Sequence, residues 1–358
     1  MQLISTFNER RGYLIATVLH GAWGHVASLP LTSETFEELT TLLLKSGSAA
    51  LGWRAISNSD LRDSPISFQL QQAYRLHTLQ AALHERSLIQ LASYLRANNL
   101  EPLLGKGWAI ARSYPEAGLR PYGDFDLYIR PGDHSAMTAL LKAPNAPAAS
   151  VDLHRGCAEL DDRGFDEIFS RSRLIPVGGA EIRIFGAEDH LRLLCLHMLR
   201  HGAWRPLWLV DVAVALETRP EDFDWDYFLS GDRRRTGWVV CAIVLASELL
   251  GAKINDTPVA HRIGALPGWL APTVLRQWGT EPKPHGTRVP MSHYLRHPSG
   301  VIEALRIRWP NAIEASVGVR APFNELPRLP FQIGECLARS ARFALQLPGI
   351  WREGKAGQ

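Results

Sequence analysis

Apolar residues recur at helical spacing in two stretches of the N-terminal third of the chain. The first stretch lies between Thr32 and Lys45, and its spacing predicts an α-helix of about three turns. The second runs from about Phe68 to Asn98 without an internal proline, which predicts one long helix, or two helices joined near Glu85. The stripe of the second stretch comprises Leu70, Tyr74, Leu76, Leu79, Leu83, Leu88, Leu91 and Leu95.

From Leu100 onwards the apolar pattern becomes short and alternating, as in β-strands. It predicts strands over 101–105, 122–129 and 149–154, with helices over 107–114 and 133–142 between them. Two further alternating segments, 172–177 and 181–185, flank Gly178-Gly179 and predict a β-hairpin. These elements together predict a small mixed β-sheet that is covered by helices.

Helical patterns return after Gly186 and continue into a proline-rich C-terminal part that includes a helical pattern over 331–345. The fold class we expect is therefore α+β, with N-terminal helices, a small mixed-sheet core and a C-terminal helical domain. A chain of 358 residues exceeds the usual size of one domain. We divide it into a mostly helical region at 1–99, an α/β core at 100–185 and a helical domain at 186–358.

Composition points to an ordinary globular protein, with 46% hydrophobic and 21% charged residues and a formal charge of only +3. This charge does not favour a nucleic-acid partner. The four cysteines form no C-x-x-C pair, no secretory leader pattern opens the chain, and no apolar run reaches the ~18 residues that span a bilayer. We expect a cytoplasmic protein without a membrane partner.

Three acidic residues stand on the predicted strands with the same parity. Asp124 and Asp126 are two residues apart, so in a strand their side chains point to one face. Asp152 lies on a neighbouring predicted strand, where it shares one face with His154. Carboxylates grouped in this way can hold a divalent cation. An Asp-x-Asp pair is also common by chance, and a solvated strand face is the alternative interpretation.

A glycine-flanked lysine, Gly105-Lys106-Gly107, follows the first predicted strand. Lys106 is one of only six lysines, against thirty-three arginines. The turn is not a P-loop, because Trp108 follows Gly107 where a serine or threonine is required, and its glycines can equally serve backbone geometry. Arg120, just before the second strand, is a candidate phosphate contact or an ordinary surface arginine.

The order of these parts resembles the uncharacterised nucleotidyltransferase family within the DNA polymerase β-like superfamily. The resemblance covers about residues 70–250. It is carried by the runs Leu104-Gly-Lys-Gly-Trp-Ala-Ile-Ala, Gly123-Asp-Phe-Asp-Leu-Tyr-Ile and Val151-Asp-Leu-His, and by His190 to Asp211, in which a histidine-containing helix precedes Trp-Leu-Val-Asp.

The resemblance implies that Asp124, Asp126 and Asp152 ligate Mg²⁺ or Mn²⁺, with Asp152 also helping to remove a proton from the acceptor. It implies that Gly105, Lys106 and Gly107, together with Arg120, contact the phosphates of a nucleoside triphosphate, for which ATP is the expected donor. The superfamily usually has Gly-Ser where this chain has Gly105-Lys106-Gly107. A lysine can neutralise a leaving pyrophosphate as a point charge.

The function expected is Mg²⁺-dependent transfer of a nucleoside monophosphate from ATP to a hydroxyl or amine of a small molecule, peptide or protein. A non-catalytic nucleotide-binding or protein-interaction module with the same fold is the alternative, which the complete set of three carboxylates disfavours. His190, His197 and His201 can share a helix face as zinc ligands or half-buried residues. Asp211 can face the active-site cleft as a base or an acceptor-binding group, or it can pair with a histidine or arginine of the preceding helix. We favour the pairing, because a buried carboxylate needs a partner.

Overall fold

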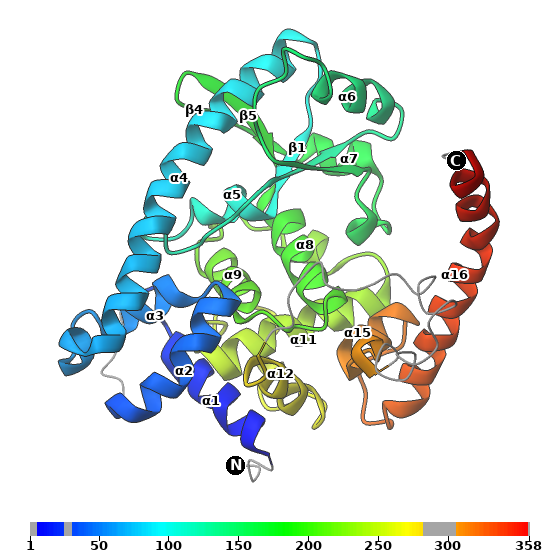
Figure 1. Cartoon of the computed structure of the whole chain (residues 1–358). Coiled ribbons are helices and arrows are strands. Elements are labelled where there is room, and N and C mark those ends of the chain that lie inside the picture. Colours follow the sequence, from blue (N-terminus) through cyan, green and yellow to red (C-terminus); the bar gives the residue numbers. More distant parts are fainter. Residues whose placement is uncertain (1–5, 25–30, 282–305, 357–358) are drawn as a thin grey trace.

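The computed structural model describes residues 6–24, 31–281 and 306–356. It confirms the α+β class: the fold combines a five-stranded mixed sheet with helices from the N-terminal and C-terminal parts of the chain. Figure 1 shows the sheet at the top, the N-terminal helices at the lower left and the last helix along the right edge. Among the described residues, no helix is long and apolar enough to cross a membrane.

The strand order of the sheet is β3-β2-β1-β5-β4. β1 is antiparallel to β2 and parallel to β5, whereas β2 is parallel to β3 and β4 is antiparallel to β5. The bounds are β1 Leu103–Gly105, β2 Phe125–Ile129, β3 Val151–Arg155, β4 Arg173–Val177 and β5 Ala180–Ile184. The strands predicted from alternation are thus confirmed, although β1, β2 and β3 begin two or three residues later than expected.

The predicted hairpin is formed by β4 and β5. Gly178 and Gly179 make its two-residue turn with φ of 47° and 86°, a conformation that glycine adopts at little cost. β5 then leads into the helical half, and the boundary that we placed near 186 falls between β5 and the next helix.

A single helix, α4 (Pro65–Ala97), runs through 33 residues and connects the N-terminal helices to the sheet. Of the two possibilities left open by the sequence, the unbroken helix is the correct one. Its C-terminal half buries Leu88, Leu91 and Leu95 against one face of the sheet, and its N-terminal half buries Leu70 in the larger core. Between them, Leu76, Leu79 and Leu83 are more than half exposed, so only the ends of the predicted stripe pack.

The N-terminal helices are α1 (Phe7–Leu19), α2 (Ser33–Ser46) and α3 (Ala49–Ile56), with a short 3₁₀ helix at Asp60–Asp63. α2 confirms the first helical prediction, and Thr32 caps it by accepting a hydrogen bond from the Thr35 N–H. α1 was not predicted, because Gly12 interrupts its pattern. That glycine is required by packing: a Cβ there would collide with the backbone of Leu275 on α12 (Leu270–Trp278).

Helices of the second half complete the larger core, which draws residues from all three predicted regions. α8 (Ala187–Arg200), α9 (Pro206–Glu217) and α11 (Arg233–Leu250) pack against one another. The C-terminal part contains α15 (Ala312–Gly318) and α16 (Leu329–Ala356), which includes the pattern predicted at 331–345. The remaining described helices are α5 Lys106–Ala111, α6 His134–Leu141, α7 Phe165–Ser170, α10 Trp225–Leu229 and α12 Leu270–Trp278, with 3₁₀ turns at Ala158–Leu160 and Ala260–Arg262.

Candidate functional site

The glycine turn after β1 has an unusual backbone. Lys106 adopts a positive φ of 46°, which is uncommon for any residue other than glycine, and Gly107 follows with φ 16° and ψ −109°. A Cβ at Gly107 would lie 3.3 Å from the carbonyl oxygen of Asp124, so the turn passes close to the start of β2. The strained backbone of this turn therefore places a buried lysine beside the predicted carboxylates.

Asp126 and Asp152 occupy paired positions on the parallel strands β2 and β3. Residues paired in this way point to the same face of the sheet, and His154, two residues beyond Asp152, joins them. One ligand atom from each of Asp126, Asp152 and His154 lies within 4.8 Å of the others. The structure thus brings together two of the three predicted carboxylates, and the group is suited to hold a cation.

Asp124 immediately precedes β2 and is exposed, whereas Asp126 is 8% exposed. It does not belong to the group of three ligand atoms within 4.8 Å. Partial burial raises the pKa of Asp124, and the negative charges of Asp126 and Asp152 raise it further. Asp124 is therefore near enough to repel both carboxylates, and its predicted role as a ligand stays a prediction.

The Lys106 ammonium lies against the innermost carboxylate. Its Nζ is 2.6 Å from Asp126 Oδ1, and His154 Nε2 lies 3.1 Å from the same oxygen. Burial alone would raise the pKa of Asp126, but the hydrogen bond from His154 and the charge of Lys106 bring it below its ordinary value. Asp126 is consequently held in its ionised form, which is the form that binds a cation.

His154 was not among the predicted site residues, although the sequence placed it on the same strand face as Asp152. Its Nε2 is 3.3 Å from Asp152 Oδ2, and its ring stacks on Tyr128 with centroids 4.3 Å apart. Lys106 Nζ lies 5.6 Å from the centroid of the same tyrosine ring. Tyr128 is fully buried and so provides a rigid support for both groups. The Asp-x-His spacing on β3 was the signal that could have identified His154.

Arg120 forms a second charged group with Asp211 of α9. Its Nη2 donates to Asp211 Oδ2 at 2.7 Å and its Nε to Oδ1 at 3.1 Å, while Tyr114 Oη donates to Oδ1 at 2.8 Å. Arg120 is 6% exposed, so the alternative of an ordinary surface arginine is wrong. Its Nη1 also donates, to the carbonyl oxygen of Pro121. Its predicted contact with phosphate stays a prediction, since each guanidinium nitrogen already has an acceptor.

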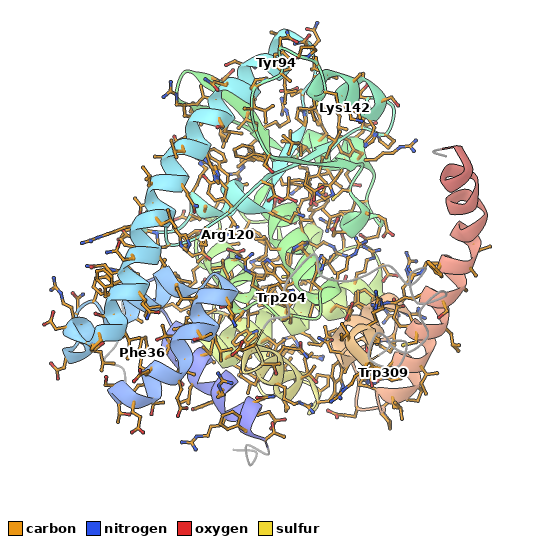
Figure 2. The ribbon with its side chains drawn as sticks, viewed as in Figure 1. Phe36, Tyr94, Arg120, Lys142, Trp204 and Trp309 are labelled. Atoms are coloured by element: carbon orange, nitrogen blue, oxygen red, sulfur yellow. The ribbon has the colours of Figure 1, made fainter. Side chains whose placement is uncertain are left out.

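The need of Asp211 for an ionic partner is confirmed, but the partner expected from the preceding helix is wrong. Asp211 is completely buried on α9, and its arginine lies 91 residues earlier in the chain rather than on α8. Figure 2 shows Arg120 where the sheet half meets the helical half. The pair therefore joins the two halves across a buried interface.

Comparison with known proteins now gives the family. The family model described as "Uncharacterised nucleotidyltransferase" matches residues 32–251, which is more than half of the chain. The chain belongs to this family. The match includes the glycine turn, all three predicted carboxylates and the Arg120–Asp211 pair.

One solved structure that is similar to the chain is an antigenic nucleotidyltransferase-like protein from Paracoccidioides brasiliensis. The two are 15% identical, with 51% of this chain and 98% of the other covered and a TM-score of 0.39. No curated protein matches the chain.

The histidines of α8 in this nucleotidyltransferase-family chain do not form a zinc site within the part of the chain that the structure describes. His197 and His201 have ring centroids 4.6 Å apart, and both contact Trp208, but His190 lies beside Phe185 instead. Burial lowers the pKa of His190 to about 4, so its ring is neutral at physiological pH. The half-buried alternative fits His197 alone, because His190 is buried and His201 is exposed.

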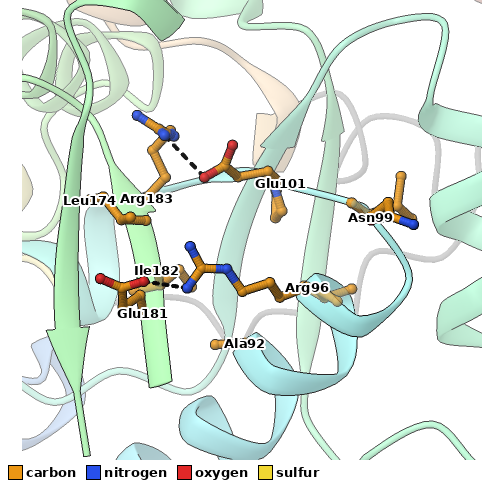
Figure 3. Close-up of a pocket in the computed structure, with 11 residues that line it drawn as sticks. Ala92, Arg96, Asn99, Glu101, Leu174, Glu181, Ile182 and Arg183 are labelled. Carbon is orange, nitrogen blue, oxygen red and sulfur yellow. Dashed lines mark hydrogen bonds and ion pairs between the residues drawn. The ribbon is translucent and has the colours of Figure 1, made fainter. Parts of the chain in front are cut away.

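A pocket of about 300 Å³ lies elsewhere, between the end of α4 and the β5–β4 edge of the sheet (Figure 3). Its charged side chains are paired with one another: Arg183 Nη2 is 3.0 Å from Glu101 Oε1, and Arg96 bonds to Glu181. None of the predicted site residues lines it. The pocket and the carboxylate group are therefore separate places in the fold.

Proposed function

We propose that the chain is a Mg²⁺- or Mn²⁺-dependent enzyme that transfers a nucleoside monophosphate from a nucleoside triphosphate, with ATP as the expected donor. The acceptor is a hydroxyl or amine of a small molecule, a peptide or a protein. The observation that carries the proposal is the pairing of Asp126 with Asp152 on adjacent strands, beside a strained turn that presents a buried lysine. Membership of a nucleotidyltransferase family supports the same reaction class.

The residues present fit a bound divalent cation. Asp126, Asp152 and His154 each offer one ligand atom within 4.8 Å of the others, we add Asp124 as a further proposed ligand, and the Lys106 ammonium contacts Asp126. Oxygen ligands of this kind suit Mg²⁺ and Mn²⁺. When bound, such an ion neutralises the charge that develops on the phosphate oxygens during an in-line displacement.

The protein groups around this position divide the remaining work. Asp126 is kept ionised by Lys106 and His154, and Asp152 is exposed at the edge of the group, where an acceptor hydroxyl can reach it. We assign to Asp152 the acceptance of the acceptor proton. Lys106 supplies a fixed positive charge for the departing pyrophosphate, with its ammonium placed by the positive-φ turn.

The test is label transfer from each of the four nucleoside triphosphates, carrying ³²P in the α-phosphate, to components of a cell extract in the presence of Mg²⁺. The wild type should transfer label and release pyrophosphate. Asp126→Asn and Asp152→Asn should not, whereas Asp63→Asn, which changes an exposed carboxylate on the 3₁₀ turn before α4, should behave as wild type.

Two results would contradict the proposal in different ways. Transfer that survives in both Asp126→Asn and Asp152→Asn would show that the site is wrong. A wild type that binds none of the four triphosphates would leave the non-catalytic interaction module as the better account.

A further inference from the structure

Four paired side chains form one block on the sheet at the candidate cation site. On the parallel strands β2 and β3, Asp126 pairs with Asp152, and Tyr128 pairs with His154. Because residues two apart on a strand share a face, all four side chains lie on the same side of the sheet. Two carboxylates therefore stand next to an imidazole and a phenol ring, and only the carboxylates are usual ligands of Mg²⁺.

The imidazole nitrogen of His154 lies between the two carboxylates. Its Nε2 is 3.1 Å from Asp126 Oδ1 and 3.3 Å from Asp152 Oδ2. Two adjacent ligand atoms of an octahedral ion with bonds of about 2.1 Å are separated by about 3.0 Å. The nitrogen is thus spaced from each oxygen as adjacent ligands of one ion would be.

The orientation of the His154 ring is fixed by aromatic packing. The ring stacks on Tyr128 with centroids 4.3 Å apart and an angle of 12° between the planes. Tyr128 is itself completely buried and packs edge-on against Phe185, with centroids 5.1 Å apart. A side chain that is held in this way loses little rotational freedom when it binds a ligand. His154 is therefore preorganised to direct Nε2 at the carboxylates.

A nitrogen ligand changes which divalent ion the site prefers. Mg²⁺ binds oxygen ligands and retains several water molecules, so an imidazole contributes little to its binding. Mn²⁺ also binds carboxylates, but as a transition-metal ion it forms stronger bonds to nitrogen, whereas Zn²⁺ is favoured by sets richer in nitrogen or sulfur. One imidazole among two carboxylates, with Asp124 as a proposed third, is a donor set that favours Mn²⁺.

We propose that His154 is a direct ligand of the ion through Nε2, and that this ligand makes the site selective for Mn²⁺ over Mg²⁺. The inference rests on the proposed function and narrows its metal requirement from either ion to Mn²⁺. Ligation uses the neutral ring, which carries its proton on Nδ1 and directs the lone pair of Nε2 at the ion.

The first experiment identifies the ligand by electron spin-echo envelope modulation of Mn²⁺ bound to the full chain without nucleotide. Wild type should show the ¹⁴N modulation of a coordinated imidazole, and protein made with ¹⁵N-histidine should lose it. His154→Gln should also lose it, although glutamine can still donate a hydrogen bond to the carboxylates. His261→Gln is the matched control, because His261 is exposed on the 3₁₀ turn Ala260–Arg262 and should leave the modulation unchanged.

The second experiment measures selectivity, with Mn²⁺ affinity from electron paramagnetic resonance and Mg²⁺ affinity from competition against Mn²⁺. His154→Gln should weaken Mn²⁺ binding by about tenfold or more, since loss of even an outer-shell group costs roughly 10- to 100-fold. Mg²⁺ binding should weaken by less than about threefold, because water readily takes the vacant position. The preference for Mn²⁺ should therefore fall in the variant.

The outcomes separate this inference from the proposed function. Wild type that binds no Mn²⁺ would overturn both. Mn²⁺ bound without ¹⁴N modulation would overturn the inference alone, as would an unchanged ratio of the two affinities in His154→Gln. A modulation that persists in His154→Gln would assign the nitrogen to another histidine. The ¹⁵N comparison uses wild type only and so does not depend on the folding of a variant. Nitrogen-ligated Mn²⁺ in a wild type that transfers no label would support the inference and contradict the proposed function.

Discussion

Two charged clusters lie close together in this molecule and differ in how their charges are balanced. The sheet cluster, Asp124, Asp126, Asp152, Lys106 and His154, contains three carboxylates against one lysine. The junction cluster, Tyr114, Arg120 and Asp211, contains one carboxylate that is matched by one arginine and one hydroxyl. On our proposal a bound cation neutralises the excess negative charge of the sheet cluster, whereas the balanced junction cluster stabilises the fold.

Burial follows the same division. Arg120 and Asp211 are both almost inaccessible, as expected for an ion pair whose partners satisfy one another. In the sheet cluster only the inner members, Lys106 and Asp126, are buried, while Asp124 and Asp152 are exposed. The sheet cluster is therefore open to solvent on one side, and the junction cluster is closed. Each prediction below changes one side of this contrast.

The largest effect is expected from Asp152→Asn in the sheet cluster. Replacing this carboxylate with an amide of similar shape should lower the rate of label transfer by about 10³-fold or more, because a cation ligand and the proton acceptor are both lost. The fold should be retained, since Asp152 is exposed. Far-ultraviolet circular dichroism provides the control, and a residual rate within tenfold of wild type would count against the assignment.

In the junction cluster, Asp211→Ala should affect stability. The substitution leaves Arg120 buried without an anion, so the free energy of unfolding should fall by about 3–5 kcal/mol. Urea denaturation measures this change. The double variant Arg120→Met/Asp211→Leu should lose less, because no unpaired charge remains. Equal losses in the single and double variants would show that the pair is not coupled.

Lys106→Met tests the competition between lysine and cation for Asp126. Lys106 Nζ lies 2.6 Å from Asp126 Oδ1, so the ammonium competes with a metal ion for this oxygen and repels the ion. Its removal should therefore increase the affinity of the protein for Mn²⁺ by roughly 3- to 10-fold. Label transfer should nevertheless decrease, since the phosphate contact is lost. Electron paramagnetic resonance of Mn²⁺ measures the affinity, and weaker metal binding in the variant would contradict this arrangement.

The smallest effect is expected from Asp124→Asn and depends on pH. The raised pKa of Asp124 means that the folded protein holds this proton more tightly than the unfolded chain does. The stabilising contribution is therefore complete at low pH and is lost as the pH rises through the folded-state pKa. At pH 7 without metal, Asp124→Asn should raise the melting temperature by on the order of 1 °C.

Divalent metal should reverse the sign of this difference, because an ionised Asp124 then faces a cation. With saturating Mn²⁺ the wild type should gain more stability than Asp124→Asn. Thermal melts of both proteins with and without Mn²⁺ at pH 7 decide the matter. An identical gain in the two proteins would exclude Asp124 from the metal ligands.

Local patterns in the sequence were sufficient for the strands that carry Asp126 and Asp152, although they did not single out His154. Alternation located β2 and β3, and side-chain parity put Asp152 and His154 on one face, so only the pairing of the strands had to be assumed. The structure supplies it by pairing Asp126 with Asp152. The hairpin at Gly178-Gly179 was likewise predictable, since its turn requires positive φ at both positions.

The junction cluster could not be assigned from local patterns. Asp211 was recognised as a charge that needs a partner, but Arg120 is 91 residues away and is brought to it by the packing of the two halves. α1 escaped prediction for the same reason, because it is stabilised by close contact with α12 more than 250 residues later.

The central claim is that Asp126 and Asp152 hold a divalent cation together with a nucleotide. The most direct test titrates Mn²⁺ into wild type and Asp152→Asn in the presence and absence of α,β-methylene ATP, with electron paramagnetic resonance as the readout. Wild type should bind Mn²⁺ more tightly when the nucleotide is present, and Asp152→Asn should lose this enhancement. Equal enhancement in both proteins would contradict the claim.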